Sequence, residues 1–130
     1  MRPTGDHFYT TSASERDAAI TNLGYVSEGI ACWVPVPTQA TRAPLYRLWN
    51  PSLADHFYTT SVPERDNAAA NLGYIPEGVA CDVYTAAQAG VVPLHRLWNP
   101  ATGDHFYTRS VFERDNAAAN LGYVSEGVAC

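Results

Sequence analysis

The feature that most constrains this chain is an internal repeat of 49 residues. The sequence Asp-His-Phe-Tyr-Thr occurs at residues 6–10, returns at 55–59 and occurs again at 104–108. The cysteines Cys32, Cys81 and Cys130 keep the same spacing. Because self-similarity at a fixed period is the signature of repeated structural units, the copies are expected to adopt one shared conformation.

The 130 residues fit one domain of three repeats, over residues 1–43, 44–92 and 93–130. A domain of this length buries roughly two thirds of its unfolded surface in a single core. A linking segment, Pro-Leu-(Tyr/His)-Arg-Leu-Trp-Asn-Pro, occurs twice, at 44–51 and 93–100. Repeat 1 therefore lacks its first strand. We expect a fragment of a longer protein, a rearranged chain, or a neighbouring chain that supplies the missing strand by edge pairing.

Three segments of each unit have the character of strands. Residues 45–49 are aliphatic and aromatic and lie between prolines, which is typical of a short strand. The turn-forming residues that follow predict that 56–59 returns as the second strand of a hairpin. In repeat 1, residues 25–34 contain β-formers, and Ile30, Cys32 and Val34 alternate as on one face of a third strand.

A helix is predicted between the second and third strands of each unit. Ser61 and Glu64 have the spacing of a capping box, as do Ser12 with Glu15 and Ser110 with Glu113. An alanine-rich segment follows, and a glycine at Gly24, Gly73 or Gly122 ends it. The fold class is therefore α+β: three strand-strand-helix-strand repeats in a closed pseudo-threefold, mostly β arrangement with one short helix each. A linear stack of three units also satisfies the pattern.

Charge and hydropathy exclude several kinds of partner. The net charge is -5, and all eight basic residues are arginines spread beside acids. Nucleic acid and anionic membranes both attract clustered basic residues, so neither is expected as a partner. The sequence contains no apolar run of the roughly 18 residues needed to span a bilayer, and its first residues do not form a signal peptide.

The repeated motifs resemble a family of repeats of unknown function in secreted bacterial and fungal proteins. The resemblance rests on the linking segment, on Asp-His-Phe-Tyr-Thr-Thr-Ser, and on Gly-Tyr-Val-x-Glu-Gly-Val-Ala, and it covers nearly the whole chain. Such repeats often lie beside hydrolases that act on cell walls or polysaccharides. The resemblance implies a secreted or extracellular location and a carbohydrate- or wall-binding role, but no functional residue.

A sugar site has a physical basis in the residues of each repeat. Sugars pack an apolar ring face on aromatic side chains and bind planar polar groups through their hydroxyls. Each of repeats 2 and 3 supplies one such set, and repeat 1 supplies a part of one. The predicted ligand-binding residues are Asp6, His7, Tyr9, Trp49, Asn50, Asp55, His56, Tyr58, Trp98, Asn99, Asp104, His105 and Tyr107.

Each of these residues also has a structural interpretation. Trp49 and Trp98 would equally suit hairpin packing, and Phe8, Phe57 and Phe106 are expected in the core because they alternate with His and Tyr. Glu28, Glu77 and Glu126 precede a glycine and are expected to pair with Arg47 or Arg96.

Metal binding, cofactors and catalysis are not expected. Adjacent Asp and His residues on one strand point to opposite faces and cannot bind one ion together. The three cysteines could converge on the threefold axis as a thiolate metal site. However, they lack Cys-x-x-Cys spacing, and a cysteine in a strand is usually a small buried apolar residue. In an exported protein at least one thiol stays free or bonds between chains, with Cys130 the first candidate. A set of residues repeated three times is more typical of binding than of an asymmetric catalytic cleft.

Two functions remain. The first is a non-catalytic, lectin-like module with up to three equivalent sites for a glycan or cell-wall polysaccharide, which gains strength through avidity. The second is a structural module whose open repeat edges join copies into homo-oligomers or filaments.

Overall fold

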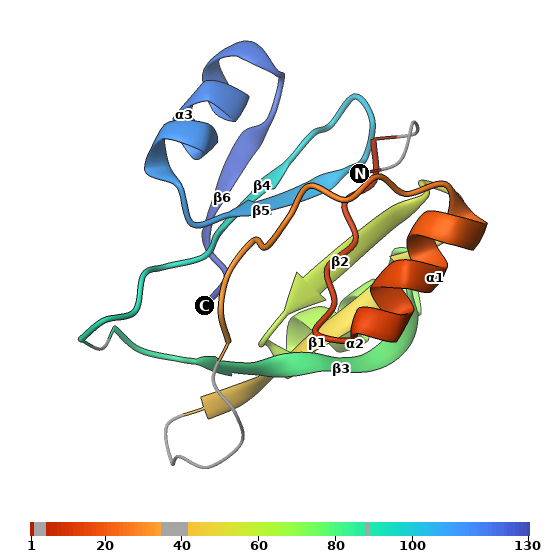
Figure 1. The fold of residues 1–130 in the computed structure, drawn as a ribbon, viewed down its shortest axis with the longest axis horizontal. Coiled ribbons are helices and arrows are strands. Elements are labelled where there is room, and N and C mark those ends of the chain that lie inside the picture. The colour runs from red at the N-terminus through yellow and green to blue at the C-terminus, as the bar shows by residue number, and fades with distance from the viewer. Residues whose placement is uncertain (2–4, 35–41, 88) are drawn as a thin grey trace.

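The computed structural model describes residues 1, 5–34, 42–87 and 89–130, and the loop expected at residues 35–40, leading from repeat 1 to repeat 2, lies outside them. These described residues contain three helices and six strands (Figure 1). In chain order they are α1 (Ala13–Leu23), β1 (Arg42–Asn50), β2 (Asp55–Thr59), α2 (Val62–Asn71), β3 (Ile75–Tyr84), β4 (His95–Trp98), β5 (His105–Thr108), α3 (Val111–Asn120) and β6 (Val124–Val128).

The strands form two antiparallel sheets of three strands, in the orders β2-β1-β3 and β5-β4-β6. The linking segment forms the central strand of each sheet, so β1 pairs with both β2 and β3. Arg47 lies opposite Tyr58 on one side and Gly78 on the other. The register then shifts so that Leu48 lies opposite Pro76, and Gly78 has a φ of 97°. This bulge requires a residue that tolerates positive φ, which explains a glycine after Glu77.

The helices begin as the capping boxes predict. The hydroxyls of Ser12, Ser61 and Ser110 each accept a hydrogen bond from the backbone N–H three residues later. One alanine in each helix is buried against the rest of the domain, namely Ala19, Ala68 or Ala117. The small side chains therefore allow close packing, and the α+β class is confirmed.

Repeat 1 differs from the prediction, because the structure assigns no strand to residues 5–10 or 25–34. These segments correspond to β2 and β3, which pair through a central strand in repeat 2. No counterpart of β1 precedes Asp6 in this sequence. The prediction of a third strand at 25–34 is wrong for that reason: β-forming residues without a strand to pair with do not make a ladder. Neither sheet closes on itself.

Within the described residues, two clusters of buried side chains stand out. Leu45, Tyr58, Val83 and Tyr107 form one, and Leu48, Phe57, Ala68 and Tyr74 form the other. Of the phenylalanines expected in the core, Phe57 is buried, while Phe8 and Phe106 are half-buried. No helix in the described part of the chain has the length and apolar character needed to cross a membrane.

Candidate functional site

Three tyrosines, one from each repeat, are joined in a ring of hydrogen bonds. The Tyr58 hydroxyl accepts from the backbone N–H of Tyr9 at 2.8 Å and donates to its carbonyl at 3.0 Å. The Tyr107 hydroxyl likewise accepts from the backbone N–H of Tyr58 and donates to its carbonyl. The Tyr9 hydroxyl makes the same two bonds with the backbone of Tyr107. The rings are perpendicular, with centroids 5.3 to 5.7 Å apart. Each tyrosine thus fixes the main chain of another repeat.

Aspartate and histidine side chains form a second set of contacts between repeats. His56 Nδ1 lies 2.9 Å from Asp6 Oδ2, and His105 Nδ1 lies 2.7 Å from Asp55 Oδ2. The third pair joins His7 and Asp104 at 3.1 Å. All six residues are buried. Each histidine therefore bonds the aspartate of another repeat rather than its own neighbour in the sequence.

Further donors complete the environment of these carboxylates. Asp55 accepts the Tyr74 hydroxyl and the backbone N–H of His105, and Asp6 accepts the Tyr25 hydroxyl and the N–H of His56. Burial alone would raise the pKa of Asp6, but the hydrogen bond and charge of His56 outweigh it, so the pKa is lowered. The carboxylates are thus well satisfied despite their burial.

The carboxylates of Asp6, Asp55 and Asp104 lie close together, with one oxygen of each within 4.8 Å of the others. That spacing could suit a cation. However, each carboxylate already accepts hydrogen bonds from a histidine and a tyrosine. We therefore interpret the cluster as a network that joins the repeats. The sequence argument about adjacent residues on one strand could not find it, because the three carboxylates come from different repeats.

Arginines of the linking segment form a third set of contacts. Arg47 Nη2 lies 2.7 Å from Glu15 of α1, and its Nε lies 3.1 Å from Glu77. Its guanidinium also covers the Phe8 ring, 4.8 Å from the centroid. Arg96 repeats this pattern with Glu64, Glu126 and Phe57. The expected pairing of Glu77 and Glu126 with these arginines is confirmed, and the helix contacts were not foreseen.

The arginine pairs also have an electrostatic consequence for the helix glutamates. The hydrogen bond from Arg47 lowers the pKa of Glu15, against an opposing contribution from burial. Arg96 lowers the pKa of Glu64 in the same way. Both glutamates are thus held ionised between two repeats.

The predicted asparagines and tryptophans lie at the ends of the central strands. Asn50 is buried, donates to the Leu72 carbonyl and accepts from the N–H groups of the following turn. Asn99 makes the equivalent contact with Leu121. Trp49 packs on His56 with ring centroids 4.6 Å apart. Trp98 remains 38% exposed, so part of its indole faces solvent.

The structure therefore separates the predicted ligand-binding residues into two groups. The Asp, His and Asn residues are buried, Tyr58 and Tyr107 are buried with them, and Tyr9 is half-buried. Within this set the tryptophans offer the aromatic surface, with Trp49 half-buried and Trp98 exposed. The sequence did not single out Trp33 and Phe112, which are 82% and 86% exposed.

Two of the three cysteines lie beside the buried cluster of Leu45, Tyr58, Val83 and Tyr107. All are unpaired thiols of intermediate exposure, and Cys81 and Cys130 pack against the tyrosine cluster. Burial, followed by the nearby thiols, raises the pKa of Cys81 and Cys130 to about 11. The thiols are therefore poor nucleophiles near neutral pH.

Comparison with known proteins places the chain in a family without an assigned activity. No curated protein and no solved structure matches the sequence. One family model, described as a domain of unknown function (DUF5648), matches residues 1–130 and so covers the whole chain. The chain therefore belongs to this family, Domain of unknown function (DUF5648).

Proposed function

We propose that this chain is a non-catalytic binding module for a glycan or cell-wall polysaccharide, working in a secreted or extracellular setting. The observation that carries the proposal is the half-open position of Trp98, whose indole is 38% exposed at the end of a central strand. An indole held in this way gives a sugar ring an apolar surface to pack on. Trp49 occupies the same place in repeat 2 but is half-buried against His56, so in this proposal a second, less open indole acts together with Trp98.

Polar groups adjoin each platform in a repeated arrangement. The ring of His56 packs against Trp49, and its Nε2 lies 3.3 Å from Oε2 of Glu77. Glu77 also pairs with Arg47. The Glu77 side chain is 32% exposed, so its carboxylate is open to sugar hydroxyls. In this proposal the tryptophans and these planar groups contact the ligand. The predicted Asp, His, Tyr and Asn residues hold the platforms in place.

We further propose that the three repeats surround a pseudo-threefold axis. The cyclic contacts of the three tyrosines and of the three Asp-His pairs support this arrangement over a linear stack. In a linear stack the first and third repeats would not touch. Here the His7 to Asp104 pair joins them.

Retention on insoluble polysaccharides tests the glycan proposal. Trp98→Ala is expected to reduce retention by about tenfold, because it removes the stacking surface, which corresponds to about 1.4 kcal/mol. Trp33→Ala is the matched control, since Trp33 is 82% exposed and has no counterpart at the same position of repeat 2, where Asp82 stands. The control should retain wild-type binding. Equal retention of the two variants, both folded by circular dichroism, would contradict the proposal.

A second candidate function is assembly through the open edge of repeat 1. It is favoured by the fact that residues 5–10 and 25–34 are not assigned as strands. The corresponding segments of repeat 2, β2 and β3, both pair with the central strand β1. Size-exclusion chromatography under reducing and oxidising conditions tests it. Assembly predicts a species larger than 14.1 kDa, the mass of one chain, in at least one condition, and a monomer in both would exclude it.

A further inference from the structure

A carboxylate adjoins the tryptophan of repeat 2 through a shared histidine. The ring of His56 packs on Trp49, with ring centroids 4.6 Å apart. Nε2 of the same imidazole lies 3.3 Å from Oε2 of Glu77. A single imidazole ring therefore separates the indole from the carboxylate, and one small ligand can contact both.

The same arrangement recurs in repeat 3, where the indole is more open. His105 lies opposite Trp98 on β5, and its Nε2 lies 3.5 Å from Oε2 of Glu126. Val124 lies opposite Trp98 on β6 and is 53% exposed. The Glu126 side chain is 30% exposed. Aromatic, aliphatic and carboxylate groups are thus open to solvent around the end of β4.

Each platform carries an excess of negative charge. Arg96 lies 3.3 Å from Glu126 through Nε and 2.8 Å from Glu64 of α2 through Nη2. The corresponding arginine of repeat 2 is placed between two glutamates in the same way. A proton on His105 would not remove the excess, because Nδ1 of that ring pairs with the buried Asp55. One guanidinium therefore faces two carboxylates at each platform.

The platform carboxylates also keep an oxygen available for a ligand. The contacts of Glu126 with Arg96 and His105 both use Oε2. The equivalent contacts of Glu77 use Oε2 as well. No hydrogen bond or ion pair among the described residues involves Oε1 of either glutamate. An ammonium group, with its three N–H donors, suits such an oxygen.

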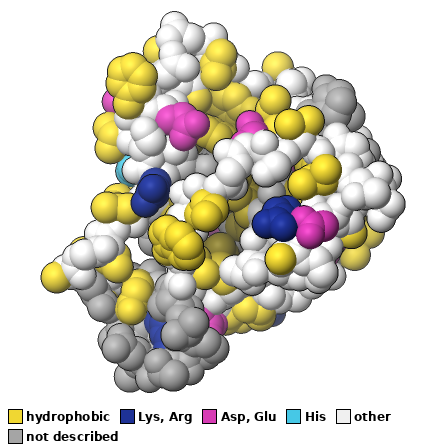
Figure 2. Space-filling model, viewed as in Figure 1, with side chains coloured by type: hydrophobic (Ala, Val, Ile, Leu, Met, Phe, Trp, Pro, Cys, Tyr) yellow, Lys and Arg dark blue, Asp and Glu magenta, His cyan; other side chains and the backbone are white. Residues whose placement is uncertain are grey.

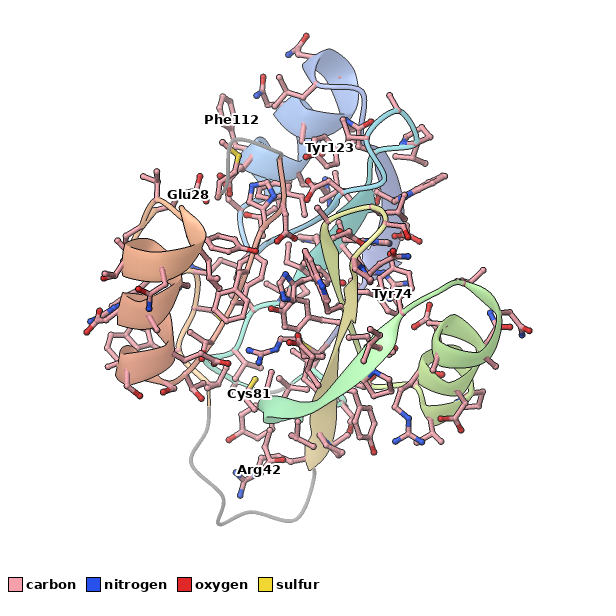
Figure 3. The ribbon with its side chains drawn as sticks, turned by 90° about the vertical axis from the view of Figure 1, so that its right-hand side faces the viewer. Glu28, Arg42, Tyr74, Cys81, Phe112 and Tyr123 are labelled. Carbon is pink, nitrogen blue, oxygen red and sulfur yellow. The ribbon has the colours of Figure 1, made fainter. Side chains whose placement is uncertain are left out.

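The strands that carry these glutamates are fixed where they begin. Tyr74 and Tyr123, both labelled in Figure 3, stand directly before β3 and β6. Their hydroxyls donate to the buried carboxylates of Asp55 and Asp104. The glutamates follow three residues later, so their positions are set before any ligand arrives.

Positive charge elsewhere on the surface is offset by neighbouring acids. Figure 2 shows an acidic side chain beside a basic one on the face that it draws. Each helix has an arginine that pairs with the next residue at 2.6 to 2.7 Å, namely Arg16 with Asp17, Arg65 with Asp66 and Arg114 with Asp115. The net charge of the chain is -5. Its field therefore attracts a cationic ligand and repels a polyanion.

We propose that the platforms bind a polysaccharide whose sugar rings carry free, protonated amino groups. This inference rests on the proposed glycan function and specifies its ligand class. The sugar ring packs on the indole of Trp98, and its ammonium group donates to Oε1 of Glu126. A sugar with a hydroxyl or acetamido group in place of the ammonium forms no ion pair with the carboxylate, and it binds more weakly for that reason.

Three hexasaccharides test this ligand class, because they share one linkage and differ only in the group beside the anomeric carbon. They are the hexamers of glucosamine, N-acetylglucosamine and glucose. Isothermal titration calorimetry with the whole chain is done at about pH 5.5, where the amino groups are protonated and glutamates are ionised. The glucosamine hexamer should bind about tenfold or more tightly than the other two. Added salt should weaken its binding alone.

Variants of the protein locate the contact. Glu126→Gln should weaken binding of the glucosamine hexamer by about tenfold and leave the neutral hexamers unchanged, because glutamine keeps the shape and loses the charge. Asp115→Asn is the matched control, since it also removes one negative charge, from a side chain on α3 that is 62% exposed and pairs with Arg114. It should leave every affinity unchanged. Trp98→Ala should weaken binding of the glucosamine hexamer as well.

Four results would overturn the proposal. Equal affinity for the three hexamers would do so and would leave the glycan function standing. Equal losses in Glu126→Gln and Asp115→Asn would reveal only a general attraction between a polycation and an acidic protein. Unchanged binding of the glucosamine hexamer by Trp98→Ala would exclude the indole as its platform. Failure of all three hexamers to bind would also overturn it, and retention on insoluble polysaccharides then decides the glycan function separately.

Discussion

Asp55→Ala is expected to destabilise the protein by about 4 kcal/mol. Asp55 is completely buried and accepts hydrogen bonds from the Tyr74 hydroxyl, His105 Nδ1 and the His105 backbone N–H. Alanine leaves all three donors buried without an acceptor, and each unsatisfied group costs about 1–3 kcal/mol. Chemical denaturation followed by circular dichroism measures the change in the free energy of unfolding.

Asp66→Ala provides the comparison for this experiment. Asp66 has the same side chain, but it is 61% exposed and pairs with the neighbouring Arg65 on the surface of α2. Surface ion pairs contribute about 0–1 kcal/mol, so this variant should remain close to wild type. If Asp55→Ala were within about 1 kcal/mol of Asp66→Ala, the network would not be what holds repeats 2 and 3 together.

Replacing Tyr58 should have the second large effect, and two substitutions separate its two contributions. Tyr58→Phe removes the hydroxyl that bonds both the N–H and the carbonyl of Tyr9, which should cost about 2 kcal/mol. Tyr58→Ala also removes a ring that packs between Tyr9 and Tyr107 and should cost about 4 kcal/mol or more. The shifts of the denaturation midpoints give both changes in the free energy of unfolding, provided that its dependence on denaturant concentration is the same in all variants.

Tyr46→Phe is the control for the loss of a hydroxyl. Tyr46 lies in the same sheet, half-buried beneath Arg65, and its hydroxyl makes no hydrogen bond within the described residues. The change should be within about 0.5 kcal/mol of wild type. Destabilisation by Tyr58→Phe no greater than this would show that the tyrosine ring does not tie the repeats together.

The local structure of each repeat could be predicted from short stretches of sequence. Ser61 and Glu64 predict where α2 begins, because capping depends on residues within one turn of helix. The alternation of residues 45–49 and the turn after Asn50 predict the β1–β2 hairpin for the same reason. The third strand predicted at residues 25–34 of repeat 1 does not form, because the described residues supply no central strand for it to pair with.

The roles of the polar residues could not be predicted in this way. His56 and Asp55 are neighbours in the sequence, yet His56 bonds Asp6, and Asp55 bonds His105. Arg47 likewise reaches Glu15 in another repeat, 32 residues away. Sequence spacing reveals which residues recur, but the partner of a side chain depends on how the repeats are placed around one another.

The sequence by itself determined the repeat, its helices and the hairpins built on its linking segment, because hydrogen bonds and packing within about 30 residues decide these features. Tertiary structure alone decided that most of the recurring Asp, His and Tyr residues turn inward and that residues 25–34 form no strand. Buried polar groups must find partners wherever the packing brings them, and here the aspartate partner of each histidine lies a full repeat or more away along the chain.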